Sequence, residues 1–153
     1  MIAPTARMAH SGKLITGTKD SGKKPVARAL ERRLFSEGRL AYFLGIGNVV
    51  YGVDADIKNS ASGHRPEHLR RLAEVAHLML DAGTILIVTA IELAQSDLEM
   101  LHTIVDVEDI EVFWIGDDIT TDIAFSRQFG RNIAAGQAAE AIRELLIAKG
   151  IIF

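Results

Sequence analysis

Hydrophobic residues along this chain alternate between short apolar blocks and longer stretches with helical spacing. Short blocks at 13–16, 40–44 and 111–115 predict strands, and a weaker block predicts another near 131–134. The block at 84–90 is almost continuously apolar, so we expect an interior strand that is buried on both faces. Strands that alternate with helices are typical of an α/β fold in which helices cover both faces of a parallel sheet.

Four stretches carry apolar residues at the period of amphipathic helices: 23–37, 67–82, 94–104 and 137–149. A glycine directly follows each of the first two stretches and is predicted to end the helix. These glycines are Gly38 and Gly83, and the core-facing positions predicted for the two helices are Val26, Ala27, Leu30, Leu34, Phe35, Leu69, Leu72, Val75, Ala76 and Met79.

The composition indicates one globular domain. With 153 residues, 48% of them hydrophobic, the chain is long enough for one full core and short for two. We assign 13–153 to this domain and 1–12 to a leader or linker. A net charge of -3 gives no general attraction to nucleic acid or anionic membranes, and no apolar run reaches the ~18 residues of a membrane span. The absence of cysteine excludes disulfides and thiolate metal sites, and it fits a cytoplasmic location.

A glycine-rich loop with a phosphate-binding pattern follows the first predicted strand and precedes the first helix. In the pattern G-x-x-x-x-G-K the backbone N–H groups cradle phosphate oxygens, the lysine reaches the outer phosphates, and a following hydroxyl holds Mg²⁺. Here a lysine replaces that hydroxyl residue, so the sequence predicts a site for ATP or another phosphate-bearing ligand and leaves the use of Mg²⁺ undecided. The predicted phosphate-binding residues are Gly17, Thr18, Lys19, Asp20, Ser21, Gly22, Lys23 and Lys24.

Several further segments carry a combined family signature. They are 26–35 after the glycine loop, 48–52 after the second strand, 65–76 and 81–83 on the second helix, and 110–113. Together with the loop, these segments resemble the adenylylsulfate kinase family over about two thirds of the chain. The resemblance implies a P-loop NTPase-type three-layer sandwich with a parallel sheet of about five strands. It also implies transfer of the terminal phosphate of ATP to the 3′-hydroxyl of adenylylsulfate in sulfate activation.

The chain departs from the family pattern where that pattern carries catalysis. Gly45 and Gly47 stand where the family has two acidic residues, and Gln95 stands where it has an arginine. The basic lid of the family is reduced to the acidic stretch 117–128. We therefore assign no catalytic residue. The residues that the resemblance leaves as a substrate-binding remnant are Asn48, Arg65 and His68, the last in place of an asparagine.

These departures favour a catalytically degenerate domain with a regulatory or assembly role in sulfate activation. Two alternatives stay open: an active kinase that uses Lys24 and Arg65, and an interaction domain that binds no nucleotide. We expect a homodimer or a contact with a sulfate-activating partner, such as the GTPase subunit of the sulfurylase to which the family is commonly fused. The apolar tail 151–153 and the helix 67–82 are the expected contact surface, unless the tail is buried in the core.

Other chemistry-bearing residues have structural interpretations. His64 and His68 lie one helical turn apart, but the sequence offers them no third ligand, so we predict no metal site. The arginines of the second helix are expected to be solvated or paired with Glu67 and Glu74. The aromatic residues of the predicted strands are expected to be packing residues; they are Tyr42, Phe43, Phe113 and Trp114.

Overall fold

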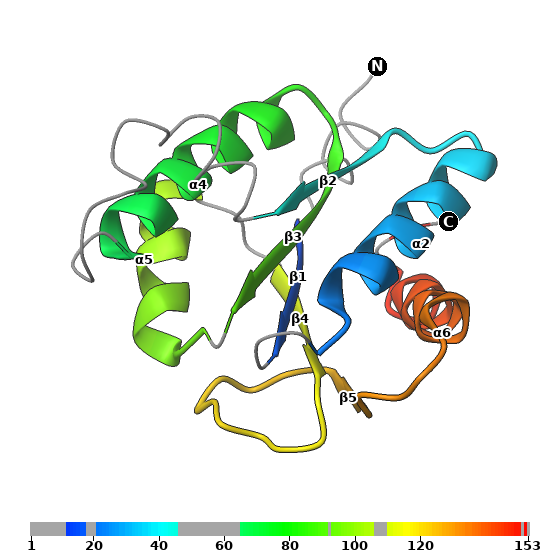
Figure 1. The fold of residues 1–153 in the computed structure, drawn as a ribbon. Coiled ribbons are helices and arrows are strands. Elements are labelled where there is room, and N and C mark those ends of the chain that lie inside the picture. The colour runs from blue at the N-terminus through cyan, green and yellow to red at the C-terminus, as the bar shows by residue number, and fades with distance from the viewer. Residues whose placement is uncertain are drawn as a thin grey trace.

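A parallel five-stranded sheet forms the centre of the molecule. The computed structural model describes residues 12–17, 21–45, 65–91, 93–105, 110–150 and 152. The strand order is β2-β3-β1-β4-β5, and all four neighbouring pairs are parallel (Figure 1). The strands are β1 (Gly12–Gly17), β2 (Ala41–Gly45), β3 (Ile85–Ile91), β4 (Ile110–Ile115) and β5 (Arg127–Phe129).

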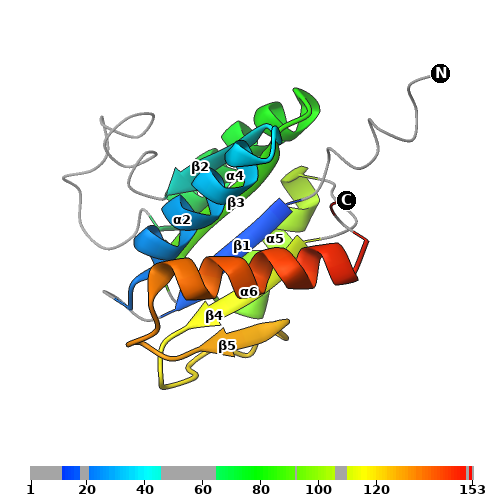
Figure 2. The ribbon, with the colours of Figure 1, turned by 90° about the vertical axis from the view of Figure 1, so that its right-hand side faces the viewer.

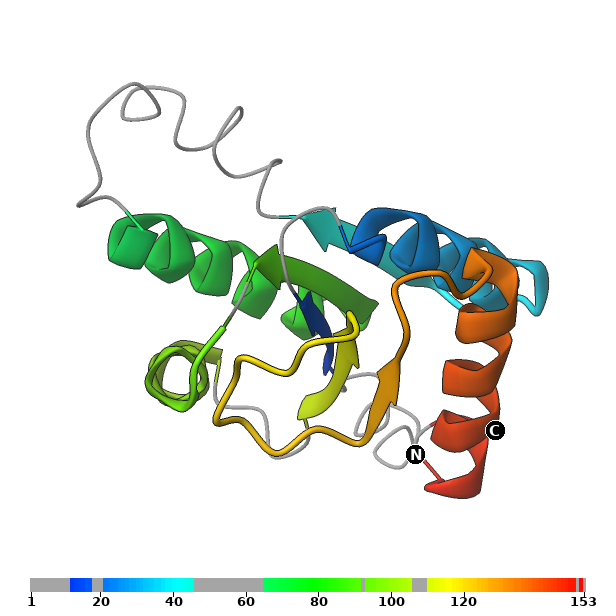
Figure 3. The ribbon, with the colours of Figure 1, turned by 60° about the horizontal axis from the view of Figure 1, so that its bottom comes forward.

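Helices cover both faces of this sheet. The helices are α2 (Lys23–Ser36), α4 (Arg65–Asp81), α5 (Gln95–Val105) and α6 (Ala135–Ala148). Figure 3 shows α4 and α5 on one side of the sheet and α2 and α6 on the other, and the core divides into two hydrophobic clusters accordingly. Leu86 and Ile87, neighbours on β3, belong to different clusters because successive strand side chains point to opposite faces. The predicted three-layer architecture is confirmed.

The interior position predicted for the apolar block 84–90 is confirmed, because β3 lies between β2 and β1. The predicted helix ends are confirmed as well: Gly38 and Gly83, each the second residue after α2 and α4, have left-handed φ angles of 78° and 88°. The prediction for the aromatic pair Phe113 and Trp114 also holds, since both side chains are completely buried.

Three predictions about individual positions were wrong. The last strand is β5, at Arg127–Phe129, and not near 131–134, because only Phe129 of this short edge strand is buried and the pattern gives no apolar block. Phe35 is 69% exposed, since it lies beside the buried stripe of α2 and not on it. Tyr42 is 44% exposed, because it points away from the face that buries Ala41 and Phe43 on the outermost strand β2.

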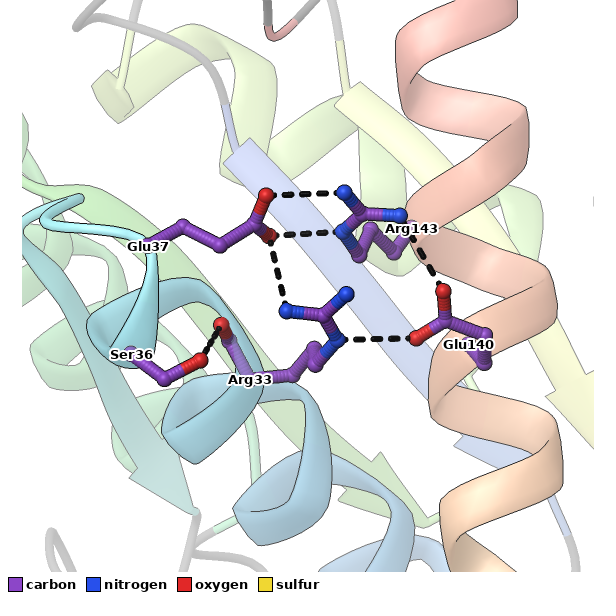
Figure 4. A network of polar contacts seen from close by, with 5 residues as sticks. All are labelled: Arg33, Ser36, Glu37, Glu140 and Arg143. Atoms are coloured by element: carbon purple, nitrogen blue, oxygen red, sulfur yellow. Dashed lines mark hydrogen bonds and ion pairs between the residues drawn. The ribbon is translucent and has the colours of Figure 1, made fainter.

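A network of ion pairs joins the C-terminal end of α2 to α6 (Figure 4). The guanidinium of Arg143 donates to both carboxylate oxygens of Glu37 at 2.6 and 2.8 Å, and the guanidinium of Arg33 donates to Glu140 at 3.0 Å. The hydrogen bonds from Arg143 lower the pKa of Glu37 from 4.5 to about 2. Figure 2 shows α2 and α6 side by side. The ion pairs therefore hold the C-terminal end of α2, the helix that begins at the glycine loop, against α6.

The C-terminal tail contributes to the core. Ile152 is 3% exposed and belongs to the cluster beneath α2 and α6, whereas Ile151 and Phe153 lie outside the described residues. Of the two placements predicted for the tail, the core placement therefore holds for Ile152.

Candidate functional site

The glycine loop begins where β1 ends, and its first glycine is required by packing. A Cβ atom on Gly17 would lie 2.0 Å from the carbonyl oxygen of Ile115 on β4 and 2.9 Å from the Oγ of Ser21. No side chain fits there, since real Cβ atoms do not approach a backbone oxygen so closely. The turn out of the sheet therefore needs glycine at this position, whether or not a ligand binds.

The end of the loop leads directly into α2. Gly22 is the N-cap residue with a left-handed φ of 97°, and no side chain caps the helix. The Nζ of Lys23 lies 3.4 Å from the Oγ of Ser21, and the Lys23 side chain is buried, whereas Lys24 is exposed. Backbone N–H groups at the start of a helix have no intrahelical partner and attract anions. Of the predicted phosphate-binding residues, 18–20 lie outside the described residues.

The first turn of α2 carries only positive side-chain charge. The first turn of α2 contains two lysines and no acidic residue. A helix N-terminus carries about half a unit of positive charge, so lysines there are unfavourable unless an anion is close. The local electrostatics therefore suit a phosphate group.

At Gly45, where the resemblance predicts the first acidic residue of the family, an added side chain would be close to its neighbours. Gly45 ends β2 and is buried, and a Cβ atom there would lie 3.2 Å from the Phe43 ring and 3.2 Å from the Oγ1 of Thr89. Such contacts require the neighbours to move by a few tenths of an ångström. Gly47, the second position, and Asn48 of the substrate-binding remnant lie outside the described residues.

The segment between β4 and β5, where the sequence predicts a reduced lid, is fixed against the carboxyl ends of β3 and β4. Residues 116–126 join β4 to β5. The hydroxyl of Thr121 donates to the carbonyl of Leu93 at 2.7 Å, and the carboxylate of Asp122 accepts the N–H of Gln95 at 2.7 Å. The indole N–H of Trp114 donates to the carbonyl of Asp118 at 3.1 Å. The acidic side chain of Asp122 therefore serves as an acceptor for the backbone of another segment.

The sequence analysis did not predict the residues whose hydrogen bonds connect the segments at the carboxyl ends of these strands. Besides Thr121 and Asp122, the buried hydroxyl of Thr16 accepts the N–H of Leu93 at 3.2 Å. These partners are separated by 27 to 77 positions in the sequence, so no local pattern indicates them.

Two of the residues predicted as a substrate-binding remnant lie at the start of α4. Arg65 begins the helix, and His68 lies in its first turn. Arg70 and Arg71 both donate to Glu67, at 2.7 and 2.8 Å, and these bonds lower the pKa of Glu67 to about 2. The predicted pairing of these two arginines is confirmed, which leaves them engaged with a carboxylate of their own helix.

Neither a metal cluster nor a membrane span is found in the part of the chain that the structure describes. No group of three or more His, Cys, Asp or Glu side chains there is arranged to hold a metal ion. None of the described helices is long and apolar enough to cross a membrane.

Sequence comparison gives a consistent set of relatives. A family model described as Adenylylsulphate kinase matches residues 12–129. The bifunctional enzyme NodQ of a Rhizobium species is 40% identical over 99 residues, which cover 64% of this chain and 15% of NodQ. An adenylyl-sulfate kinase of Clostridium acetobutylicum is 39% identical over 98 residues, which cover 64% of this chain and 48% of that kinase. The matched part therefore spans less than half the length of these relatives.

Structural comparison agrees. A variant of the Mycobacterium tuberculosis APS kinase CysC superposes with a TM-score of 0.78 at 26% identity, covering 90% of this chain and 96% of that one. The same kinase in complex with AMPPNP and APS superposes with a TM-score of 0.76 at 22% identity, covering 90% and 97% of the two chains.

Proposed function

This chain belongs to the adenylylsulphate kinase family, and we propose that it binds a nucleotide without transferring its phosphate. In this proposal the domain has a regulatory or assembly role in sulfate activation. The glycine loop, the buried Lys23 and the positive start of α2 hold the phosphates of ATP.

The observation that carries the proposal is Gly45. The family pattern has an acidic residue at this position, which is thought to orient or deprotonate the substrate hydroxyl. In this chain a Cβ atom at Gly45 would lie 3.2 Å from both the Phe43 ring and the Thr89 hydroxyl, so a side chain there would require these neighbours to shift. Removing a positioned acid or base typically lowers a rate by roughly 10²–10⁴-fold. Phosphoryl transfer depends almost wholly on positioning and charge, so the further loss of the metal-binding hydroxyl and of the basic lid leaves little catalysis.

The active-kinase alternative has support of its own. Relatives about 40% identical are named adenylyl-sulfate kinases, and the family's loop is kept up to Lys23. A direct assay separates the two functions. Purified protein with ATP, Mg²⁺ and adenylylsulfate is expected to show no turnover above background, whereas a rate within about tenfold of the ~1–100 s⁻¹ of ordinary kinases would refute our proposal.

Nucleotide binding is tested separately, because it distinguishes our proposal from an interaction domain that binds no nucleotide. Calorimetric titration with ATP is expected to give saturable binding, which Lys23→Ala abolishes. Arg32→Ala is the matched control, since it removes an exposed cation from the same helix about 13 Å further along its axis. Equal ATP affinity in all three proteins, or no binding by the natural chain, would contradict the proposed site.

The assembly role rests on two observations. The relative NodQ is named a bifunctional enzyme, of which the matched region is 15%. In addition, large apolar side chains are exposed on the surface, among them Phe35, Leu40 and Leu78 at 69%, 62% and 68%. We propose a homodimer or a contact with a sulfate-activating partner. Sedimentation equilibrium at micromolar concentration tests the homodimer, and a pure monomer would exclude it.

A further inference from the structure

The strand β2 forms one end of the sheet, and its outer edge pairs with no other strand among the residues that the structure describes. On its inner edge, the N–H of Ile85 on β3 donates to the carbonyl of Leu40 at 2.8 Å. Because the backbone groups of successive strand residues point to opposite edges, those of Ala41 and Phe43 point outward. An unpaired edge is a template on which another strand can add, so native proteins usually block it.

The segment that carries this edge is suited to pairing with a copy of itself. Residues 40–45 contain no charged side chain and no proline, and Leu40 and Tyr42 are 62% and 44% exposed. In an antiparallel pair of two β2 strands centred on Tyr42, the outward groups of Ala41 in one copy meet those of Phe43 in the other. The two Tyr42 side chains then lie opposite each other, a favourable aromatic pair. The arrangement is self-complementary, as a two-fold contact requires.

A carboxylate from α2 lies against this edge. The Oε2 of Glu31 accepts the N–H of Phe43 at 2.6 Å. The guanidinium of Arg28, one turn earlier on the same helix, lies 5.7 Å from the centroid of the Phe43 ring, so α2 runs beside the strand. Ala41, the next outward residue, borders a surface pocket together with Phe35. The N–H that an added strand needs at Phe43 is therefore already bonded, and the carboxylate repels the carbonyl oxygens of an approaching strand.

We propose that the outer edge of β2 is a self-pairing surface and that Glu31 keeps it closed in the natural chain. The occupant that Glu31 excludes is β2 of a second copy of this chain. Since the acceptor belongs to a side chain, the edge is closed without a bulge or a break in the strand. The proposal does not depend on nucleotide binding. It also narrows the proposed assembly role, because a natural homodimer then uses exposed side chains such as Leu78 and not strand addition at β2.

The test compares the sedimentation masses of variants with that of the natural chain over a range of micromolar concentrations. Glu31→Ala removes the acceptor and is expected at least to double the mass as the concentration rises, since a two-fold contact joins two copies. Glu31→Gln keeps a side-chain carbonyl that can accept the Phe43 N–H, so its mass should stay close to that of the natural chain. Glu144→Ala is the charge-matched control, because it removes an exposed carboxylate from α6, and it should leave the mass unchanged.

A second substitution places the association at β2. Adding Tyr42→Lys to Glu31→Ala puts like charges opposite each other in the paired strands and should return the mass to that of the natural chain. Circular dichroism checks that each variant is folded. If Glu31→Ala does not fold, Glu31→Asp serves instead, because its carboxylate is one methylene too short to keep the bond to Phe43. An unchanged mass in the folded variant, or an increased mass that Tyr42→Lys does not reverse, overturns the proposal.

Discussion

Gly17→Ala is the substitution for which the structure gives the sharpest expectation. The added methyl group would lie 2.0 Å from the carbonyl oxygen of Ile115, and that oxygen belongs to the backbone of β4. Because β1 and β4 are paired at this position, the carbonyl cannot move without disturbing the sheet. Overpacking of a core typically costs about 1–3 kcal/mol, and a clash with backbone belongs at the upper end, so we expect a loss of about 3 kcal/mol.

The matched control is Gly136→Ala in α6. A Cβ atom at Gly136 meets nothing within 4 Å, and alanine favours a helix over glycine by up to about 1 kcal/mol. The assay is urea unfolding followed by the fluorescence of Trp114, the single tryptophan, which is completely buried. With a slope of about 1–3 kcal/mol per molar urea, Gly17→Ala should lower the midpoint by about 1–3 M, while Gly136→Ala should leave it equal or raise it.

An unchanged midpoint for Gly17→Ala would refute the packing argument and show that β4 can yield at Ile115. A lowered midpoint has a consequence for function. It means that selection for folding alone keeps Gly17, so this glycine carries no information about a ligand. Among the loop residues, evidence for nucleotide binding then depends on Lys23 and Lys24.

Three further predictions follow from individual contacts. Arg143 lowers the pKa of Glu37, so the stabilisation from this pair is present above pH about 4.5 and is lost as the pH falls through about 2; Glu37→Gln should weaken the dependence of the melting temperature on pH in that window. Trp114→Phe removes the donor to the Asp118 carbonyl, should destabilise the fold by about 1–3 kcal/mol, and should speed proteolysis within 116–126. Ile152→Ala should cost about 2–5 kcal/mol without changing the sedimentation mass, whereas a changed mass would place the tail in a contact.

The sequence predicted the elements whose burial follows a simple period. The helices and β3 have long apolar patterns, and each was located to within two residues. The short strand β5 was not predicted at its position, because its one buried residue, Phe129, gives no alternating apolar pattern. Phe35 was misplaced because it directly follows the buried Leu34, and residues 100° apart on a helix can lie on either side of a buried boundary.

Contacts between distant segments were beyond sequence reasoning. The exclusion of a side chain at Gly17 arises from Ile115, nearly a hundred positions later, which only the pairing of β1 with β4 brings close. The tie between Asp122 and the start of α5 likewise depends on two parallel strands ending at the same edge. A single sequence contains the residues of such contacts but not the register that joins them.

The departures at Lys24 and Gly45 change the charge of the site in the same direction. Relative to the family pattern, one adds a positive charge and the other removes a negative one. Two other departures, Gln95 in place of an arginine and the acidic stretch 117–128 in place of the basic lid, change the charge in the opposite direction. The charge changes therefore do not by themselves distinguish a retained phosphate site from a decayed one. The first turn of α2 contains two lysines at the positive end of the helix dipole, which suits a phosphate group. The calorimetric titration with ATP decides between the two explanations, since a decayed site does not bind the nucleotide.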